Sequence, residues 1–155
     1  MQSLIKDINF APEGRKKIEW VSNFMPTLNT LGDRKQKEQT FKGQTIVVSV
    51  HLEAKTAYLA TVLKRGGADV IVTGSNPLST QDDVAAGLVD MGITVYAWYD
   101  CTDEEYFNFL HKALDHKPHI IIDDGGDLVN LLHTSRQDAK ERLIGGSEET
   151  TTGVH

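Results

Sequence analysis

The stretch QTIVVSVHLEAKTAYLATVLKRGGADVIVTG, residues 44–74, determines the fold that we expect. Its ends, residues 44–50 and 68–74, are apolar and rich in β-branched residues, which is typical of buried strands. Residues 54–67 between them carry apolar side chains at helical spacing and reach Gly66, a residue that commonly ends helices. Because two parallel strands need a long crossover, this order predicts a parallel strand–helix–strand unit.

The same alternation continues along the chain. Further helices are predicted at 80–92 and 103–117, and further strands at 93–98 and 119–123. Thr80 with Asp83, and Thr102 with Glu105, have the spacing of helix-capping boxes. Apolar strands separated by amphipathic helices predict an α/β fold, a Rossmann-like open parallel sheet with helices on both faces.

The two ends of the chain are less regular. Residues 1–43 predict one helix at 12–25, with Pro12 in its first turn, followed by a charged connector at 32–43. We therefore expect two parts, an N-terminal helix with its connector at 1–43 and a Rossmann-like domain at 44–155. The chain ends in an irregular tail.

Composition limits the class of protein. The chain has 155 residues, of which 39% are hydrophobic and 25% charged, as in a soluble globular domain. Its net charge of −6 argues against a general nucleic-acid binder. No apolar run approaches the ~20 residues of a membrane span, and the N-terminus lacks a signal-peptide layout. With Cys101 as the only cysteine, neither an intrachain disulfide nor a cysteine-based zinc site is possible, and a cytoplasmic location is expected.

Polar residues follow each predicted strand, at the sheet edge where ligands bind in open α/β folds. His51 follows the first strand and is either an acid–base residue or a structural histidine. The run 123–127, DDGGD, could bind a hard cation, supply one functional carboxylate, or form a solvated turn with Asp127 capping a helix. Neither calcium-loop spacing nor a GKS or GKT motif accompanies it, so no metal site is predicted. Residues 147–153, SEETTTG, could contact a polar ligand or form a disordered tail.

Taken together, these motifs resemble the N-terminal, substrate-binding part of the S-adenosylhomocysteine hydrolases, over residues 8–155. The residues that carry the resemblance are His51 with Thr56-Ala57, Asn76, 79–82, Ala97-Trp98, 123–128 and 147–155. Members of this family reversibly split S-adenosylhomocysteine into adenosine and homocysteine. The resemblance implies a bound NAD that oxidises the ribose 3′-hydroxyl, elimination of homocysteine, addition of water and reduction of the ketone.

The resemblance also implies roles for individual residues. His51 and Asp124 match the acid–base residues beside the 4′ and 5′ carbons, and Asp124 also contacts the substrate. Glu149 matches the carboxylate that binds the ribose hydroxyls. Further substrate contacts are expected from Glu53, Lys55, Thr56, Asn76 and Gln81, and NAD contacts from Thr150, Thr151 and Thr152. The family acts on a nucleoside thioether in the S-adenosylmethionine cycle of one-carbon metabolism, as a cytoplasmic homotetramer.

Two departures from the family pattern lead to further expectations. Glu53 and Lys55 stand where many members have Thr and Glu, and a lysine can only donate hydrogen bonds, which suits the 6-oxo group of hypoxanthine. S-inosylhomocysteine is therefore an alternative substrate, unless Lys55 pairs with Glu53 or points to solvent. The chain also stops at His155, before the family's NAD-binding domain. We expect a truncated chain that is inactive alone, with a non-catalytic nucleoside-binding module as the alternative.

Overall fold

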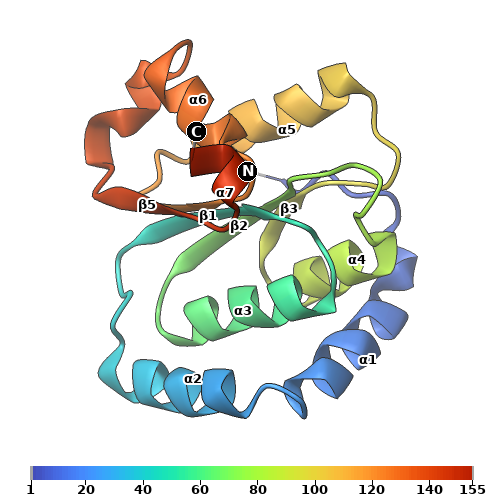
Figure 1. Cartoon of the computed structure of the whole chain (residues 1–155). Coiled ribbons are helices and arrows are strands. Elements are labelled where there is room, and N and C mark those ends of the chain that lie inside the picture. Colours follow the sequence, from blue (N-terminus) through green and yellow to red (C-terminus); the bar gives the residue numbers. More distant parts are fainter. Residues whose placement is uncertain (1, 155) are drawn as a thin grey trace.

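The computed structural model describes residues 2–154; Met1 and His155, the last residue of the 147–155 motif, lie outside it. The described chain forms one five-stranded sheet in the order β3-β2-β1-β4-β5, in which every pairing is parallel (Figure 1). The strands are β1 (Thr45–Val50), β2 (Asp69–Gly74), β3 (Thr94–Tyr96), β4 (Ile120–Asp123) and β5 (Gly145–Glu148). The predicted fold class, a Rossmann-like open α/β sheet, is confirmed.

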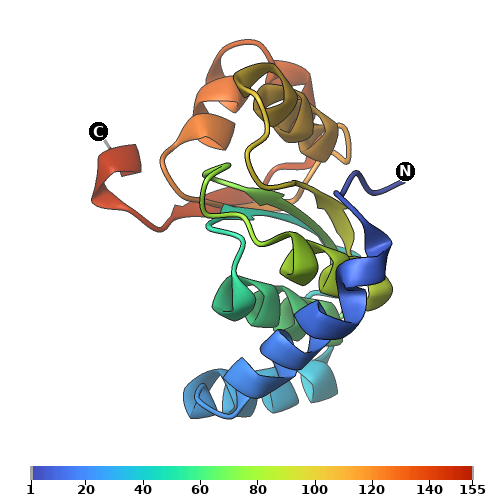
Figure 2. The same cartoon turned by 90° about the vertical axis from the view of Figure 1, so that its right-hand side faces the viewer.

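Helices cover both faces of this sheet. α3 and α4 lie on one face, and α5 and α6 on the other, while α1 and α2 form an outer layer against α3 and α4 (Figures 1 and 2). The α-helices are α1 (Ala11–Ser22), α2 (Pro26–Glu38), α3 (Ala54–Arg65), α4 (Asp82–Asp90), α5 (Asp103–Leu114), α6 (Asp127–His133) and α7 (Thr151–Val154). Two 3-10 helices, η1 (Ile8–Phe10) and η2 (Gln137–Arg142), complete the described chain.

Successive residues of the central strands point to opposite faces and are buried on both. Val47 and Ile71 pack with α5 and α6, whereas Ile46 and Val72 pack with α3 and α4. All four side chains are at most 1% exposed. Burial on both faces explains why these strands are apolar without interruption.

One part of the predicted connector is helical. Residues 32–38, expected as connector, form the second half of α2, which begins at Pro26 and ends where Gln39 adopts a left-handed conformation with φ 50°. Charge pairs one turn apart stabilise this half: Lys35 and Glu38 approach to 3.2 Å. The polar composition of residues 32–38 therefore gave no indication that they belong to a surface helix. The first helix, predicted to end at Met25, ends at Ser22.

Of the two capping boxes, only one forms. Thr102 and Glu105 exchange side-chain and main-chain hydrogen bonds at the start of α5, as predicted. The box at Thr80 and Asp83 is wrong, because α4 begins at Asp82 and the Thr80 hydroxyl donates to the Asn76 carbonyl oxygen at 3.1 Å. The Thr80 hydroxyl therefore stabilises the loop before α4 and does not cap the helix itself.

The edges of the sheet involve the least regular parts of the sequence. Leu4 forms a parallel bridge with Tyr96 and so covers part of the β3 edge. At the opposite edge, the tail supplies β5, which the sequence did not predict and which pairs with β4 in register from Ile120↔Gly145 to Asp123↔Glu148. Within residues 2–154, no helix is both long and apolar enough to span a bilayer.

Candidate functional site

The winding of the sheet reverses between β1 and β4. From β1 the chain moves outward through β2 to β3, then returns to place β4 on the other side of β1. The loops after β1 and β4 diverge at this point, which is where open α/β sheets bind ligands. His51 follows β1 and Asp124 follows β4, so the topology brings together two residues that lie far apart in the sequence.

The side chains of His51 and Asp124 are in contact at this position. His51 Nε2 lies 3.4 Å from Asp124 Oδ2. The histidine side chain is 50% exposed, whereas that of the aspartate is only 8% exposed. Asp124 Oδ2 also accepts a hydrogen bond from Ser75 Oγ at 3.0 Å, so the loop after β2 contributes to the same cluster. An exposed imidazole beside a buried carboxylate can hold and transfer a proton.

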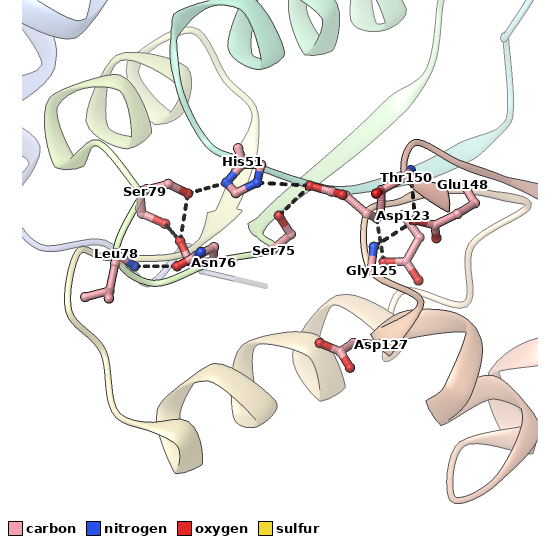
Figure 3. Close-up of polar contacts among 12 residues, drawn as sticks. His51, Ser75, Asn76, Leu78, Ser79, Asp123, Gly125, Asp127, Glu148 and Thr150 are labelled. Carbon is pink, nitrogen blue, oxygen red and sulfur yellow. Dashed lines mark hydrogen bonds and ion pairs between the residues drawn. The ribbon is translucent and has the colours of Figure 1, made fainter. Parts of the chain in front are cut away.

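The loop 75–80 covers the other side of the His51 ring. Ser79 Oγ lies 2.5 Å from His51 Nδ1 and 3.1 Å from the Asn76 carbonyl oxygen (Figure 3). The exposed Asn76 closes the loop, because its side-chain oxygen accepts from the Leu78 amide at 2.9 Å. Asn76 therefore lies near His51 with its side-chain oxygen engaged in the turn.

Asp123, directly before Asp124, is a structural centre of the site. Its side chain is 1% exposed, and its two oxygens accept from the Asp124 amide at 3.1 Å and the Val129 amide at 3.0 Å. Its own carbonyl oxygen accepts from the Glu149 amide at 2.9 Å. One buried residue thus joins the Asp124 loop, the start of α6 and the exit from β5.

Burial raises the pKa of Asp123 from 3.8 to about 6. The carboxylates of Glu148 and Asp127 raise this pKa further, while the two amide hydrogen bonds oppose the shift. Asp123 also shares a sheet register with Ser49, whose hydroxyl is buried and has no hydrogen-bond partner within residues 2–154. The ionised carboxylate is therefore held by main-chain donors in a poorly solvated position.

Glu148 connects the Asp124 loop to the tail. Its Oε1 accepts from the Gly125 amide at 2.7 Å and the Thr150 amide at 3.2 Å. A Cβ atom on Gly153 would lie 2.4 Å from the Glu148 carboxyl carbon, so the glycine allows α7 to pack directly on this group. The resemblance implies a role for Glu149 but none for Glu148, whose contacts follow from the pairing of β5 with β4.

The other residues expected to contact the substrate lie at the start of α3 and α4. Glu53 caps α3, with Oε1 accepting from the amides of Lys55 at 3.0 Å and Thr56 at 3.1 Å. Thr56 is buried, and Lys55 is exposed without an ion pair to Glu53 in the described chain. Gln81 lies before α4, where its Oε1 accepts from Lys17 Nζ at 3.3 Å.

The tail places the remaining candidates beside this edge. Glu149 is exposed directly after β5. Thr151 and Thr152 are exposed in the short helix α7, and Thr150 is half-buried before it. Exposed hydroxyls of this kind fit a contact with a polar cofactor such as NAD, but the glycine-rich loop that binds a dinucleotide pyrophosphate is not found in the sequence.

Asp127 has a different role from the predicted helix cap. The residue before α6 is Gly126, and Asp127 Oδ2 accepts from the Tyr106 hydroxyl at 2.8 Å. Burial, together with this hydrogen bond, raises the pKa of Tyr106 well above its usual value of 10. Over residues 2–154, no three His, Cys, Asp or Glu side chains are placed to hold a metal ion.

A parallel open sheet with a histidine–aspartate contact at its switch point defines the class of open α/β domains, in which ligands bind at this edge of the sheet. The chain belongs to the S-adenosyl-L-homocysteine hydrolase family, whose sequence model matches residues 2–147. It is 54% identical over 150 residues to the S-inosyl-L-homocysteine hydrolase of Methanocaldococcus jannaschii. It is 53% identical over 150 residues to the adenosylhomocysteinase of Pyrococcus abyssi. These alignments cover 97% of this chain and 36% of each relative.

A bacterial relative extends the comparison. The adenosylhomocysteinase of Thermotoga maritima is 54% identical over 141 residues, which cover 91% of this chain and 35% of the relative. The chain therefore spans about a third of the length of the curated relatives that it matches. The resemblance inferred from the motifs is confirmed at the level of the family.

Proposed function

We propose that this chain is the substrate-binding part of an adenosylhomocysteinase, the enzyme that reversibly hydrolyses S-adenosyl-L-homocysteine to adenosine and L-homocysteine. The observation that carries this proposal is the contact between His51 and Asp124 at the β1–β4 switch point. Family membership and the names of the relatives support the reaction. The complete enzyme would act as an NAD-dependent homotetramer in the cytoplasm.

Each residue of the edge has a chemical task in this proposal. His51 and Asp124 would move protons at the 4′ and 5′ positions of the ribose, since their side chains are in contact and His51 is accessible. Glu149, exposed beside them, would accept hydrogen bonds from the ribose hydroxyls. Asp123 would position Asp124 through its amide.

The same edge would contribute to the cofactor site. Thr150, Thr151 and Thr152 would contact NAD. This assignment is supported by the exposure of Thr151 and Thr152 and by the Glu148 carboxylate, which accepts from the amides of both Thr150 and Gly125. When bound, NAD supplies reversible oxidation of the ribose 3′-hydroxyl. Since the phosphate-binding loop is not in this sequence, we expect the 155-residue chain alone to bind NAD weakly and to be inactive.

Binding of nucleosides to the 155-residue chain tests the proposal. Calorimetry should detect adenosine binding, and Asp124→Asn or Glu149→Gln should each weaken it about 10-fold or more, because each removes a charged hydrogen-bond partner. Glu104→Gln, on the exposed first turn of α5, is a matched control that should leave the affinity unchanged. A chain that is folded but binds no nucleoside, or binds all variants equally, would contradict the proposal.

The second candidate is a hydrolase that prefers S-inosylhomocysteine. Its support is the exposed ammonium group of Lys55 at the start of α3, together with the M. jannaschii relative of that name. A lysine donor would favour the 6-oxo group of hypoxanthine over the 6-amino group of adenine. Equal or tighter binding of adenosine than of inosine, unchanged by Lys55→Gln, would rule this candidate out.

A further inference from the structure

Ser79 contacts the ring nitrogen of His51 that does not face Asp124. The two contacts differ in length, since Nδ1 lies 2.5 Å from Ser79 Oγ and Nε2 lies 3.4 Å from Asp124 Oδ2. A neutral imidazole carries a single proton, so one nitrogen donates and the other accepts. The partners on each side therefore decide which nitrogen holds the proton.

Both partners favour the same arrangement. Asp124 as a carboxylate can only accept, and so it requires the proton on Nε2. Ser79 can donate its hydroxyl proton to an unprotonated Nδ1. The competing acceptor for that proton is the Asn76 carbonyl oxygen at 3.1 Å, which already accepts from the Ser79 amide at 3.2 Å and from Thr80 Oγ1 at 3.1 Å. Because that oxygen already has two other donors and lies farther from Ser79 Oγ than Nδ1 does, at 3.1 Å against 2.5 Å, His51 is the stronger acceptor for the Ser79 proton while Nδ1 is unprotonated.

We propose that Ser79 is a positioning residue that fixes neutral His51 as the Nε2–H tautomer, so that the ring presents a proton donor to Asp124 and to a bound ligand. The inference rests on the proposed function for its purpose, because an N–H donor on Nε2 can give a hydrogen bond to the oxygen or sulfur atom that departs from the ribose 5′ position. When His51 is protonated, Nδ1–H donates to Ser79 Oγ, and the hydroxyl turns to the Asn76 carbonyl. Neither charge state then leaves a ring nitrogen without a partner.

Nitrogen NMR of the ¹⁵N-histidine-labelled 155-residue chain tests this assignment without any ligand. His51 is one of six histidines, and His51→Asn identifies its signals by their loss. Above the titration range, the parent chain should show a pyrrole-type Nε2 and a pyridine-type Nδ1. In Ser79→Ala the tautomer ratio should fall about two- to tenfold, which corresponds to one lost hydrogen bond.

Two further variants separate positioning from general disruption of the loop. Ser79→Thr keeps the hydroxyl and should restore the parent signals. Leu78→Ala shortens an exposed apolar side chain of the same loop that bonds neither His51 nor the Asn76 carbonyl, and it should leave the tautomer unchanged. A proton on Nδ1 in the parent, or an undiminished Nε2–H tautomer in Ser79→Ala, overturns the proposal. If Ser79→Ala does not fold, the tautomer of His51 in the spectra of the parent and of Ser79→Thr tests the proposal. Since no nucleoside is present, failure here is distinct from failure of the proposed function.

Discussion

Replacement of Asp123 by asparagine should change how stability depends on pH. The pKa of Asp123 lies at about 6 in the folded chain and at 3.8 in the reference state. The folded chain therefore binds this proton more tightly, so the contribution of Asp123 is most favourable below pH 3.8 and is lost as the pH rises to about 6. At about 1.4 kcal/mol per pKa unit, the loss amounts to about 3 kcal/mol.

The asparagine does not titrate, but it cannot match both hydrogen bonds. One amide oxygen can still accept from a main-chain donor, while the side-chain NH₂ would face the other donor, at a cost of about 1–3 kcal/mol. Asp123→Asn should therefore be less stable than the parent near pH 3.5 and similar to it at pH 7. The difference in free energy of unfolding between the two proteins should change by about 3 kcal/mol over this range.

Urea denaturation at several pH values between about 3.5 and 7 measures this difference. Ser49→Ala is a suitable control, because it alters the same buried register without removing a titrating group, and its curve should run parallel to that of the parent. Parallel curves for Asp123→Asn and the parent would refute the reasoning, since they would show that burial does not perturb this carboxyl group.

Two further predictions concern the framework of the site. Gly14→Ala should destabilise the fold by several kcal/mol in urea denaturation, because a Cβ there would lie 1.7 Å from the Asp83 carbonyl oxygen and separate α1 from α4. Gly145→Ala is the control and should be close to neutral, because nothing lies within 4 Å of the added atom. Equal effects of the two substitutions would contradict this explanation. Thr102→Ala should lower the free energy of unfolding by about 1 kcal/mol, because it removes the capping box of α5, whereas Thr80→Ala should leave the α4 N-terminus unaffected. Amide exchange in the first turn of each helix measures both effects. Faster exchange at α4 in Thr80→Ala would instead favour the cap that the sequence pattern predicts.

The sequence predicted the sheet better than its surroundings. Strands such as 44–50 are apolar because they are buried on both faces, so their burial can be predicted directly from the sequence. Residues 32–38 and 145–148 lack an apolar pattern of this kind, because α2 is largely exposed and β5 consists of Gly-Gly-Ser-Glu at the edge of the sheet. The structure of these segments also depends on partners distant in the sequence: α2 packs on α3, where Asp33 accepts from Arg65 at 2.6 Å, and β5 pairs with β4.

The site shows the same division. The position of His51 and Asp124 after their strands was predictable from topology, and the structure places their side chains in contact. Ser79, Asp123 and Glu148 were not identified as supporting residues, because their roles depend on hydrogen bonds made only after the loops fold back. The signal available for Ser79 was its place in the loop after β2, on the same sheet edge as His51.

The pairing of β1 with β4 also has a kinetic consequence. β1 pairs with β2 across a single crossover, with Ile46 opposite Val70. Ile46 also pairs with Ile120 of β4, but two further strand–helix units lie between these residues in the sequence. Closing this large loop carries the greater entropic cost, and non-local pairing slows folding. His51 can therefore meet Asp124 only at a late stage of folding. A partly folded chain with β1, β2 and β3 already assembled would still lack the contact between His51 and Asp124, so this contact should appear together with the native state rather than before it.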